Sequence, residues 1–256
     1  AKEAALLARL RDQIRDLRVP HVFYAQTDSG EDWPPHLVLE YVDGVALREL
    51  VVAGDRRAVT EAARDVGRVL ARIASVAFTE SGFLRGDLTV DPTFGGYPTT
   101  YRGLVARLMA SSRFRERVTA PAIAAIESFV DRWAELVDAR AASTLVHGDF
   151  NSRNIFVRDI DGRWRVAAVL DWEFAMSGNY ASDVGNMLRY ERADRRRFEP
   201  AFSEGMRDGG LALPTDWLAH ARALDLIALV ELAGRRDLPA NVLEEILALI
   251  DRTVRA

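Results

Sequence analysis

The chain contains no cysteine, so disulfide bonds and thiolate chemistry are excluded, and a cytoplasmic location is the expectation. The formal net charge of −4 gives no indication of a nucleic-acid-binding surface. No apolar run approaches the roughly 20 residues that span a bilayer, so we expect no membrane partner. The four histidines are scattered, without the spacing of zinc ligands. What remains is the composition of an ordinary globular protein, with 28% charged and 49% apolar residues.

Three side chains that bind metals or move protons gather in one short segment. Asp149 follows an apolar pair, Asn154 comes five residues later before an apolar strand, and Asp171 ends the next apolar strand. The Asp-Gly dipeptide at 161–162 separates these strands and is a strong signal for a two-residue hairpin turn. That turn would place Asn154 opposite Val169, with Asp171 two residues further on and on the same face. The pattern predicts that Asn154 and Asp171 meet at the open end of the hairpin, beside Asp149.

These three groups suit phosphoryl transfer. The amide oxygen of Asn154 and the carboxylate of Asp171 are the hard oxygen ligands that Mg²⁺ prefers. The carboxylate of Asp149 is then free to accept a proton from an attacking hydroxyl, while the metal neutralises charge on the transferring phosphate. Taken alone, Asp149 could be a turn aspartate that bonds its own backbone. Its combination with the other two favours a catalytic base.

The segment resembles the signature of the aminoglycoside phosphotransferase family, a branch of the protein-kinase-like fold. That signature is His-Gly-Asp, an Asn five residues after the Asp, and an apolar strand that ends in Asp; here it reads His147-Gly148-Asp149, Asn154 and Asp171. The resemblance implies an α+β fold with two lobes. It also implies transfer of the γ-phosphate of ATP or GTP to a hydroxyl of an aminoglycoside-like antibiotic. By the same resemblance, His147 supports the loop and does not carry protons.

A second element follows the signature. Residues 178–183 read Gly-Asn-Tyr-Ala-Ser-Asp and match the family's Gly-Asn/Asp-Pro-x-x-Asp element, with Ala181 at or beside the usual proline. By resemblance, Asp183 opens a helix and fastens the catalytic loop by accepting backbone N–H bonds. The alternative is a simple helix cap, which uses nearly the same physics. Glu173 is either a solvated or paired charge or a further metal ligand.

The front of the chain predicts an amphipathic helix, with apolar residues near helical spacing from Leu6 to Leu17. Glu3 shares the face of Leu7 and Leu10, so it should point inward. In the resembling family this helix carries a glutamate that pairs with the lysine that binds ATP phosphates. The resemblance therefore makes Glu3 a candidate residue of the nucleotide site.

Two strands should follow this helix, one around residues 21–24 and one over residues 37–42. The second resembles the hinge between the lobes of a kinase. Backbone groups near Glu40 and Val42 would then meet the adenine of the nucleotide.

The glycine-rich hairpin and the strand lysine that precede this helix in such kinases are absent from the sequence. Lys2 is the only lysine and, being adjacent to Glu3, it cannot be the missing partner. We therefore expect that a preceding segment carries both elements. The alternative is a protein that has lost its phosphate clamp. The presence of Asp149, Asn154 and Asp171 argues against that alternative.

The position of the hinge predicts that the chain has two lobes. Residues 1–42 would be the remnant of a nucleotide-binding lobe. Residues 43–256 would be a mainly helical lobe that holds the catalytic loop and the substrate site. Residues 78–100, rich in Gly, Pro and Thr, should form an ordered loop insertion. Helical periodicity predicts helices over 59–77, 101–109, 123–136, 217–233 and 242–254.

Substrate specificity should reside in the helical lobe, where Asp225 and Glu231 are candidate contacts. Glu231 lies seven residues after Leu224, on an apolar face where a carboxylate requires a partner. The favoured interpretation is pairing of Glu231 with Arg235 and of Asp225 with Arg222. The functional alternative is an acidic wall for a cationic substrate.

Three classes of function remain open. The first is a kinase of a small hydroxylated molecule, either an aminoglycoside-like antibiotic or a metabolite such as a sugar, homoserine or a choline-like alcohol. The second is a non-catalytic nucleotide-binding pseudokinase. The third is a metal-dependent hydrolase that uses Asp149 and Asp171. No sequence feature fixes the oligomeric state.

Overall fold

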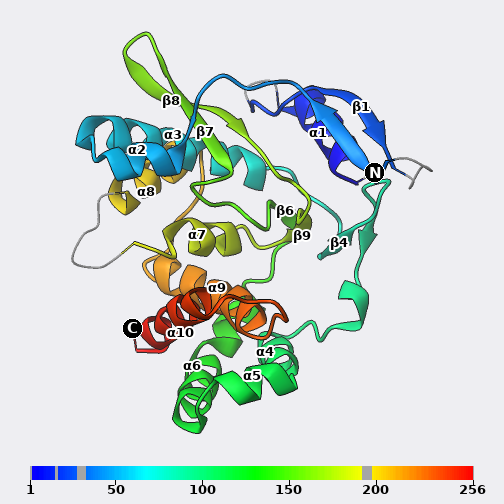
Figure 1. Ribbon diagram of the computed structural model, residues 1–256, viewed down its shortest axis with the longest axis vertical. Helices are drawn as coiled ribbons and strands as arrows, with labels where there is room; N and C mark the ends of the chain where they lie inside the picture. The colour runs from blue at the N-terminus through cyan, green and yellow to red at the C-terminus, as the bar shows by residue number, and fades with distance from the viewer. Residues whose placement is uncertain (1, 15–16, 28–32, 192–197, 256) are drawn as a thin grey trace.

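The computed structural model describes residues 2–14, 17–27, 33–191 and 198–255, and the structural statements below refer to these residues. The fold is α+β: long helices pack around three small antiparallel sheets (Figure 1). The helix α1 and the first two strands lie at one end of the molecule, and the C-terminal helices lie at the other (Figure 1).

The front of the chain forms a helix and a hairpin. Helix α1 (Lys2–Gln13) buries Leu6, Leu7 and Leu10, as the periodicity predicted. Strands β1 (Val22–Gln26) and β2 (His36–Leu39) pair antiparallel. The second strand ends at Leu39, three residues before the predicted end, because the chain leaves the hairpin after the backbone bond from Glu40 N–H to His21 O.

A three-stranded sheet carries the predicted hairpin. Its order is β3 (Val45–Ala46), β7 (Ile155–Ile160) and β8 (Arg163–Val169). The turn residues Asp161 and Gly162 both have positive φ, at 53° and 76°, as a type I′ turn requires.

The predicted register of this hairpin is correct near the turn and wrong near the site. Val157 pairs with Val166, but Phe156 pairs with Ala168, so Ala167 is an extra residue that forms a β-bulge. Val169 therefore faces Ile155 and not Asn154. Period-two alternation carries no information about a bulge, which is why the sequence argument missed it.

A four-stranded sheet lies beside the catalytic loop, in the order β5 (Val90–Asp91), β4 (Gly82–Leu84), β9 (Met176–Gly178) and β6 (Thr144–Val146). The segment 78–100 is ordered, but it is more than a loop, since it supplies β4, β5 and the short 3-10 helix Phe94–Gly96. The predicted insertion thus extends the sheet whose β6 leads into Asp149.

Most predicted helices are present with modest shifts of their ends. Helix α3 begins three residues earlier than predicted because the Asp55 carboxylate accepts the N–H bonds of Arg57 and Ala58. The remaining bounds are α2 Leu47–Ala53, α3 Arg56–Ala74, α4 Tyr101–Met109, α5 Ser112–Arg117, α6 Ala120–Ala139, α7 Ala181–Leu188, α8 Glu199–Asp208, α9 Trp217–Ala233 and α10 Ala240–Val254.

The core has two parts. One part lies between α1, α3, α8 and the β7–β8 hairpin. The other lies between α4, α6, α9 and α10. Helices α3 and α8 cross so closely that a Cβ on Gly205 would lie 1.9 Å from the backbone oxygen of Arg64, and one on Gly67 would lie 2.2 Å from that of Phe202. Only glycine fits at these two crossing points.

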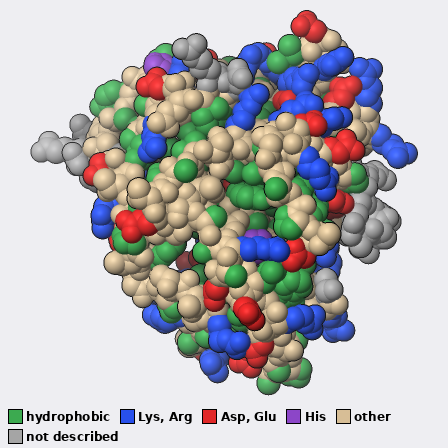
Figure 2. All heavy atoms as spheres, turned by 180° about the vertical axis from the view of Figure 1, so that it is seen from behind, with side chains coloured by type: hydrophobic (Ala, Val, Ile, Leu, Met, Phe, Trp, Pro, Cys, Tyr) green, Lys and Arg blue, Asp and Glu red, His purple; other side chains and the backbone are tan. Residues whose placement is uncertain are grey.

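The surface carries mixed charge. Basic side chains gather at the upper right of Figure 2, with carboxylates among them. Around α3 the structure pairs Arg57 with Glu61, Arg64 and Arg68 with Asp208, and Arg165 with Asp65. No helix within the described ranges has the length and apolar character needed to cross a membrane.

Candidate active site

Asp149 lies in the loop between β6 and β7, where amide groups hold its carboxylate. Asn151 Nδ2 donates to Oδ1 at 2.8 Å, and Asn154 Nδ2 donates to Oδ2 at 2.8 Å. Asn186 Nδ2, from α7, lies 3.4 Å from Oδ1. A carboxylate held in place by amide donors can take the proton of an acceptor hydroxyl. The side chain is thus oriented as a base and remains partly exposed to an acceptor.

His147 is buried and its two ring nitrogens have different partners. Nε2 lies 2.9 Å from the Leu170 carbonyl oxygen, and Nδ1 lies 3.2 Å from the Asp149 backbone N–H. The ring therefore donates from Nε2 and accepts at Nδ1, which fixes the neutral tautomer. Burial lowers the His147 pKa to about 4. These contacts place His147 as a support between the loop and the end of β8.

We expect His147 to make folding stability depend on pH. Its folded pKa of about 4 lies below the ordinary value of 6.5, so the unfolded chain takes up a proton that the folded chain refuses. The stability that the neutral His147 ring contributes is therefore fully present above pH 6.5. It is lost on acidification towards pH 4, by about 1.4 kcal/mol per pH unit. Denaturant unfolding at a series of pH values should give a shallower slope for His147→Gln than for the parent. Equal slopes in this window would contradict the assigned tautomer.

Asp183 ties the loop to α7. Its carboxylate is 1% exposed and accepts the backbone N–H of His147 at 2.7 Å and of Gly148 at 3.0 Å. Burial raises the Asp183 pKa to about 7, and the two N–H bonds oppose that rise. Helix α7 begins at Ala181, so Asp183 lies in its first turn and is not a simple N-cap. The loop needs glycine at Gly148, because φ there is 82° and a Cβ would lie 2.5 Å from the Phe174 oxygen.

Asp171 follows β8 with a left-handed φ of 65°, which is uncommon for a residue other than glycine. Burial raises its pKa first, and the negative charges of Glu173, Glu3 and Asp149 raise it further. A carboxylate among carboxylates is stabilised by a cation. The Leu170 N–H also donates to the Asn154 backbone oxygen at 2.8 Å, so Asp171 is adjacent in space to the Asn154 and Asp149 pair.

These oxygen donors suit a Mg²⁺ ion that also binds phosphate and water. They suit a metal ion whose ligands all come from the protein less well. The amide nitrogen of Asn154 is directed at Asp149, so Oδ1 is the side-chain atom of Asn154 that is left to bind a metal. Within the part of the chain that the structure describes, no three His, Cys, Asp or Glu side chains form a metal-binding group. A site with one carboxylate and one amide oxygen suits a metal whose other ligands are phosphate oxygens and water.

Helix α1 is fastened to the segment after Asp171 by two consecutive residues. Glu3 Oε1 accepts the Trp172 backbone N–H at 3.0 Å, and Lys2 Nζ donates to the Ala175 oxygen at 3.0 Å. Burial lowers the Lys2 pKa, and the charges of Glu173 and Glu3 oppose this. Glu3 therefore reaches the site, and it does so through the backbone that positions Asp171.

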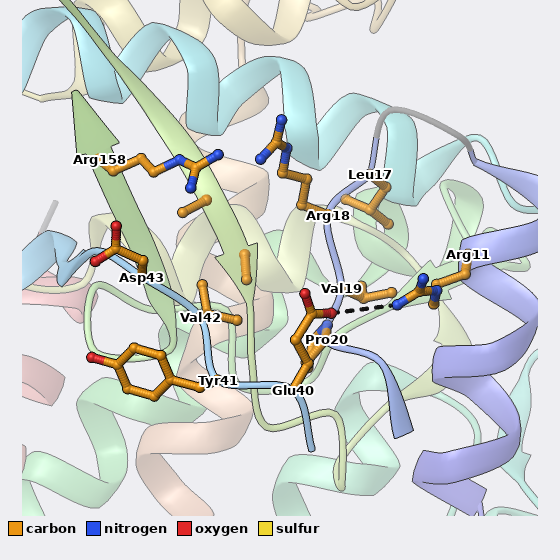
Figure 3. Close-up of a pocket in the computed structure, with 12 residues that line it drawn as sticks. Arg11, Leu17, Arg18, Val19, Pro20, Glu40, Tyr41, Val42, Asp43 and Arg158 are labelled. Carbon is orange, nitrogen blue, oxygen red and sulfur yellow. Dashed lines mark hydrogen bonds and ion pairs between the residues drawn. The ribbon is translucent and has the colours of Figure 1, made fainter. Parts of the chain in front are cut away.

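The residues proposed as a hinge, 40–42, follow β2 and belong to no helix or strand. The Glu40 side chain accepts the His21 backbone N–H at 3.0 Å and pairs with Arg11 at 3.5 Å (Figure 3). These contacts fix the side chain of Glu40. That backbone groups of Glu40 and Val42 meet the adenine stays a prediction.

The two candidate substrate residues have different surroundings from those predicted. Asp225 is buried and binds Arg189, the residue that follows α7, through three hydrogen bonds of 2.7–3.2 Å, where the sequence suggested Arg222. Glu231 pairs with Arg235 at 3.2 Å, as the favoured interpretation had it. Glu231 is exposed, however, so the expectation that it lies on a packed face was wrong.

Sequence reasoning missed two of the residues that hold Asp149. Asn151 stands two residues after it, and an Asx-type contact could have been proposed from that spacing. Asn186 lies 37 residues away on α7, and its approach depends on how α7 packs, so no local signal could have identified it.

The arrangement of sheets, helices and loop is that of the aminoglycoside phosphotransferases, whose fold is protein-kinase-like. The structure superposes on aminoglycoside phosphotransferase APH(4)-Ia with a TM-score of 0.71 at 18% identity, covering 99% of this chain and 81% of that one. It superposes on the GDP complex of aminoglycoside 2′-phosphotransferase-IIIa with a TM-score of 0.69 at 15% identity, covering 99% and 81%. These likenesses establish the fold.

The chain belongs to the phosphotransferase enzyme family, whose model matches residues 1–222. A sequence relative is the viomycin phosphotransferase of Streptomyces vinaceus, 28% identical over 172 residues. That match covers 65% of this chain and 54% of the relative, so it spans about half the relative's length.

Proposed function

We propose that the protein transfers the γ-phosphate of ATP or GTP to a hydroxyl group of an aminoglycoside-like antibiotic. The observation that carries the proposal is the environment of Asp149: three amide groups direct their Nδ2 atoms at its carboxylate, and the charge of Asp149 raises the pKa of Asp171. That geometry serves a base that takes the proton of an acceptor hydroxyl as its oxygen attacks phosphorus.

Each neighbouring residue has a role in this proposal. Asn154 and Asp171 would hold Mg²⁺, which when bound would neutralise charge on the phosphates. His147 and Asp183 keep the loop in place through backbone contacts. Glu3 would position the Asp171 segment by accepting the Trp172 backbone N–H.

The nucleotide and the acceptor are inferred from relatives. Solved structures of this fold include a complex of APH(4)-Ia with ADP and hygromycin B and the GDP complex of the 2′-phosphotransferase, which supports a purine nucleotide as co-substrate. The relative named for viomycin supports an antibiotic as acceptor. Backbone groups of Glu40 and Val42 would meet the base.

A screen of acceptors with Mg-ATP and Mg-GTP tests this function. We expect phosphate to appear on an aminoglycoside or a related antibiotic, with nucleotide consumption that depends on the acceptor. If phosphate were transferred only to a sugar, homoserine or a choline-like alcohol, the acceptor would be a metabolite and not an antibiotic. Phosphate release without any acceptor would support a hydrolase in place of a kinase.

The role of Asp171 gives a separate prediction. Asp171→Ala removes a metal ligand, so it should weaken the binding of the metal–nucleotide complex as well as the chemical step. Titration of Mg²⁺ and nucleotide, followed by fluorescence and by turnover, measures both. Unchanged nucleotide affinity and Mg²⁺ dependence would show that Asp171 is structural.

A further inference from the structure

A cavity of about 420 Å³ lies between the segment 17–20, the segment 40–43 and the β7–β8 hairpin (Figure 3). This volume is in the range of small-molecule sites. Its apolar wall includes Val19, Val42 and Ala168, and its polar lining consists of three arginines and two carboxylates: Arg11, Arg18, Arg158, Glu40 and Asp43. One small molecule with a charged group fits this lining.

Arg158 has no structural explanation in the surrounding chain. It stands directly opposite Arg165 on β8, an unfavourable pairing of like charges. Arg165 is neutralised by Asp65 at 3.0 Å. The Arg158 Nε is buried and has no hydrogen-bond partner among the described residues. A buried donor without a partner costs about 1–3 kcal/mol, and the arginine that bears this cost also lines the cavity.

Arg18 completes the basic side of the cavity. Arg18 and Arg158 both line the cavity, and Figure 3 draws their guanidinium groups on the same side of the segment 40–43. The backbone oxygen of Arg18 accepts the Val169 N–H at 3.2 Å, so Arg18 is anchored to the same hairpin that carries Arg158. Arg11 is already paired with Glu40. Two guanidinium groups are therefore available for a dianion, and guanidinium matches phosphate geometry.

This cavity is separate from the phosphoryl-transfer site. Asp149, Asn154 and Asp171 do not line it. Arg158 lies four residues along the chain from Asn154, which is about 13 Å of extended strand. The purine base that would lie near Val42 carries no charge for two arginines to neutralise. The nucleotide phosphates belong at the catalytic loop, so they do not account for Arg18 and Arg158.

We propose that this cavity binds a small molecule through a phosphate group held between Arg18 and Arg158. The rest of the molecule would lie along Ala167 and Ala168, with the Glu40 and Asp43 carboxylates available to accept from hydroxyls. Glu40 and Val42 line this cavity and are also proposed to meet the nucleotide base, but the phosphate would be held by Arg18 and Arg158, which have no role in the proposed phosphotransferase function.

Isothermal titration with inorganic phosphate, at constant ionic strength and with saturating Mg-ADP, tests the site. We expect saturable binding that becomes weaker by about tenfold or more in Arg158→Gln and in Arg18→Gln, the effect of losing one charge-assisted bond. Arg163→Gln is the matched control, because Arg163 is exposed on the same hairpin and lies outside the cavity. Asp43→Asn should tighten binding, since it removes a competing negative charge.

A second measurement requires no variant. In NMR spectra of the parent protein, the Arg158 Nε–H signal should shift with phosphate and with sulfate, a compact dianion of the same shape. The account is overturned by equal phosphate affinity in Arg158→Gln and the parent, by an Arg158 signal that does not move, or by acetate binding as tightly as phosphate.

Discussion

Replacing Asp149 with asparagine should reduce turnover by a factor of roughly 10² or more, the scale of a lost general base. Nucleotide affinity should stay nearly unchanged, because the proposed metal ligands Asn154 and Asp171 remain. The amide of the introduced side chain has the shape of the carboxylate but no charge with which to accept a proton. Steady-state turnover and nucleotide titration on the same preparation provide the measurement.

A matched control separates this effect from a general change of charge. Asp159→Asn alters an exposed carboxylate on β7, away from the amide groups that hold Asp149, and it should leave turnover unchanged. Turnover of Asp149→Asn at the level of the parent would remove Asp149 from its role as base.

Replacing Asp225 with alanine should lower the free energy of unfolding by about 3–5 kcal/mol. The side chains of Arg189 and Asp225 are only 10% and 6% exposed, so the variant leaves the charge of Arg189 buried without its partner. Arg189 follows directly on α7, the helix that also contributes Asn186 and Asp183 to the site. Chemical denaturation measures the loss of stability.

The contrast with Glu231 makes this second prediction specific. Glu231→Gln removes an exposed helical pair with Arg235, which should cost no more than about 0.5 kcal/mol. A substrate-binding Asp225 would behave in the opposite manner, with a raised acceptor KM and unchanged stability in Asp225→Ala. That outcome would restore the acidic-wall hypothesis for this position.

The parts of the fold that could be predicted from the sequence are those that local physics decides. The spacing of apolar residues located 101–109 and 217–233 as helices with their observed ends. The Asp-Gly pair located the turn at 161–162, because that turn needs two residues with positive φ. Helix α3 shifted by three residues because its start is set by the Asp55 side-chain cap and not by apolar spacing.

The parts that could not be predicted depend on contacts between distant segments. The bulge at Ala167 and the left-handed Asp171 both break the alternation on which the predicted facing of Asn154 and Val169 depended. The motif still identified the right neighbours, since Asn154 bonds Asp149 and the charge of Asp149 raises the Asp171 pKa. The partner of Asp225 was missed for a similar reason: Arg189 lies just after the end of a different helix, and helical spacing considers only residues on the same helix.

The most direct test of the central claim is the detection of phosphate on an acceptor hydroxyl, by mass spectrometry, for the parent and for Asp149→Asn with the same nucleotide. We expect a phosphorylated antibiotic in the first reaction and a loss of about 10² or more in its rate of formation in the second. Nucleotide binding by the parent without transfer to any hydroxyl acceptor would contradict it and would identify a nucleotide-binding protein that is not a kinase.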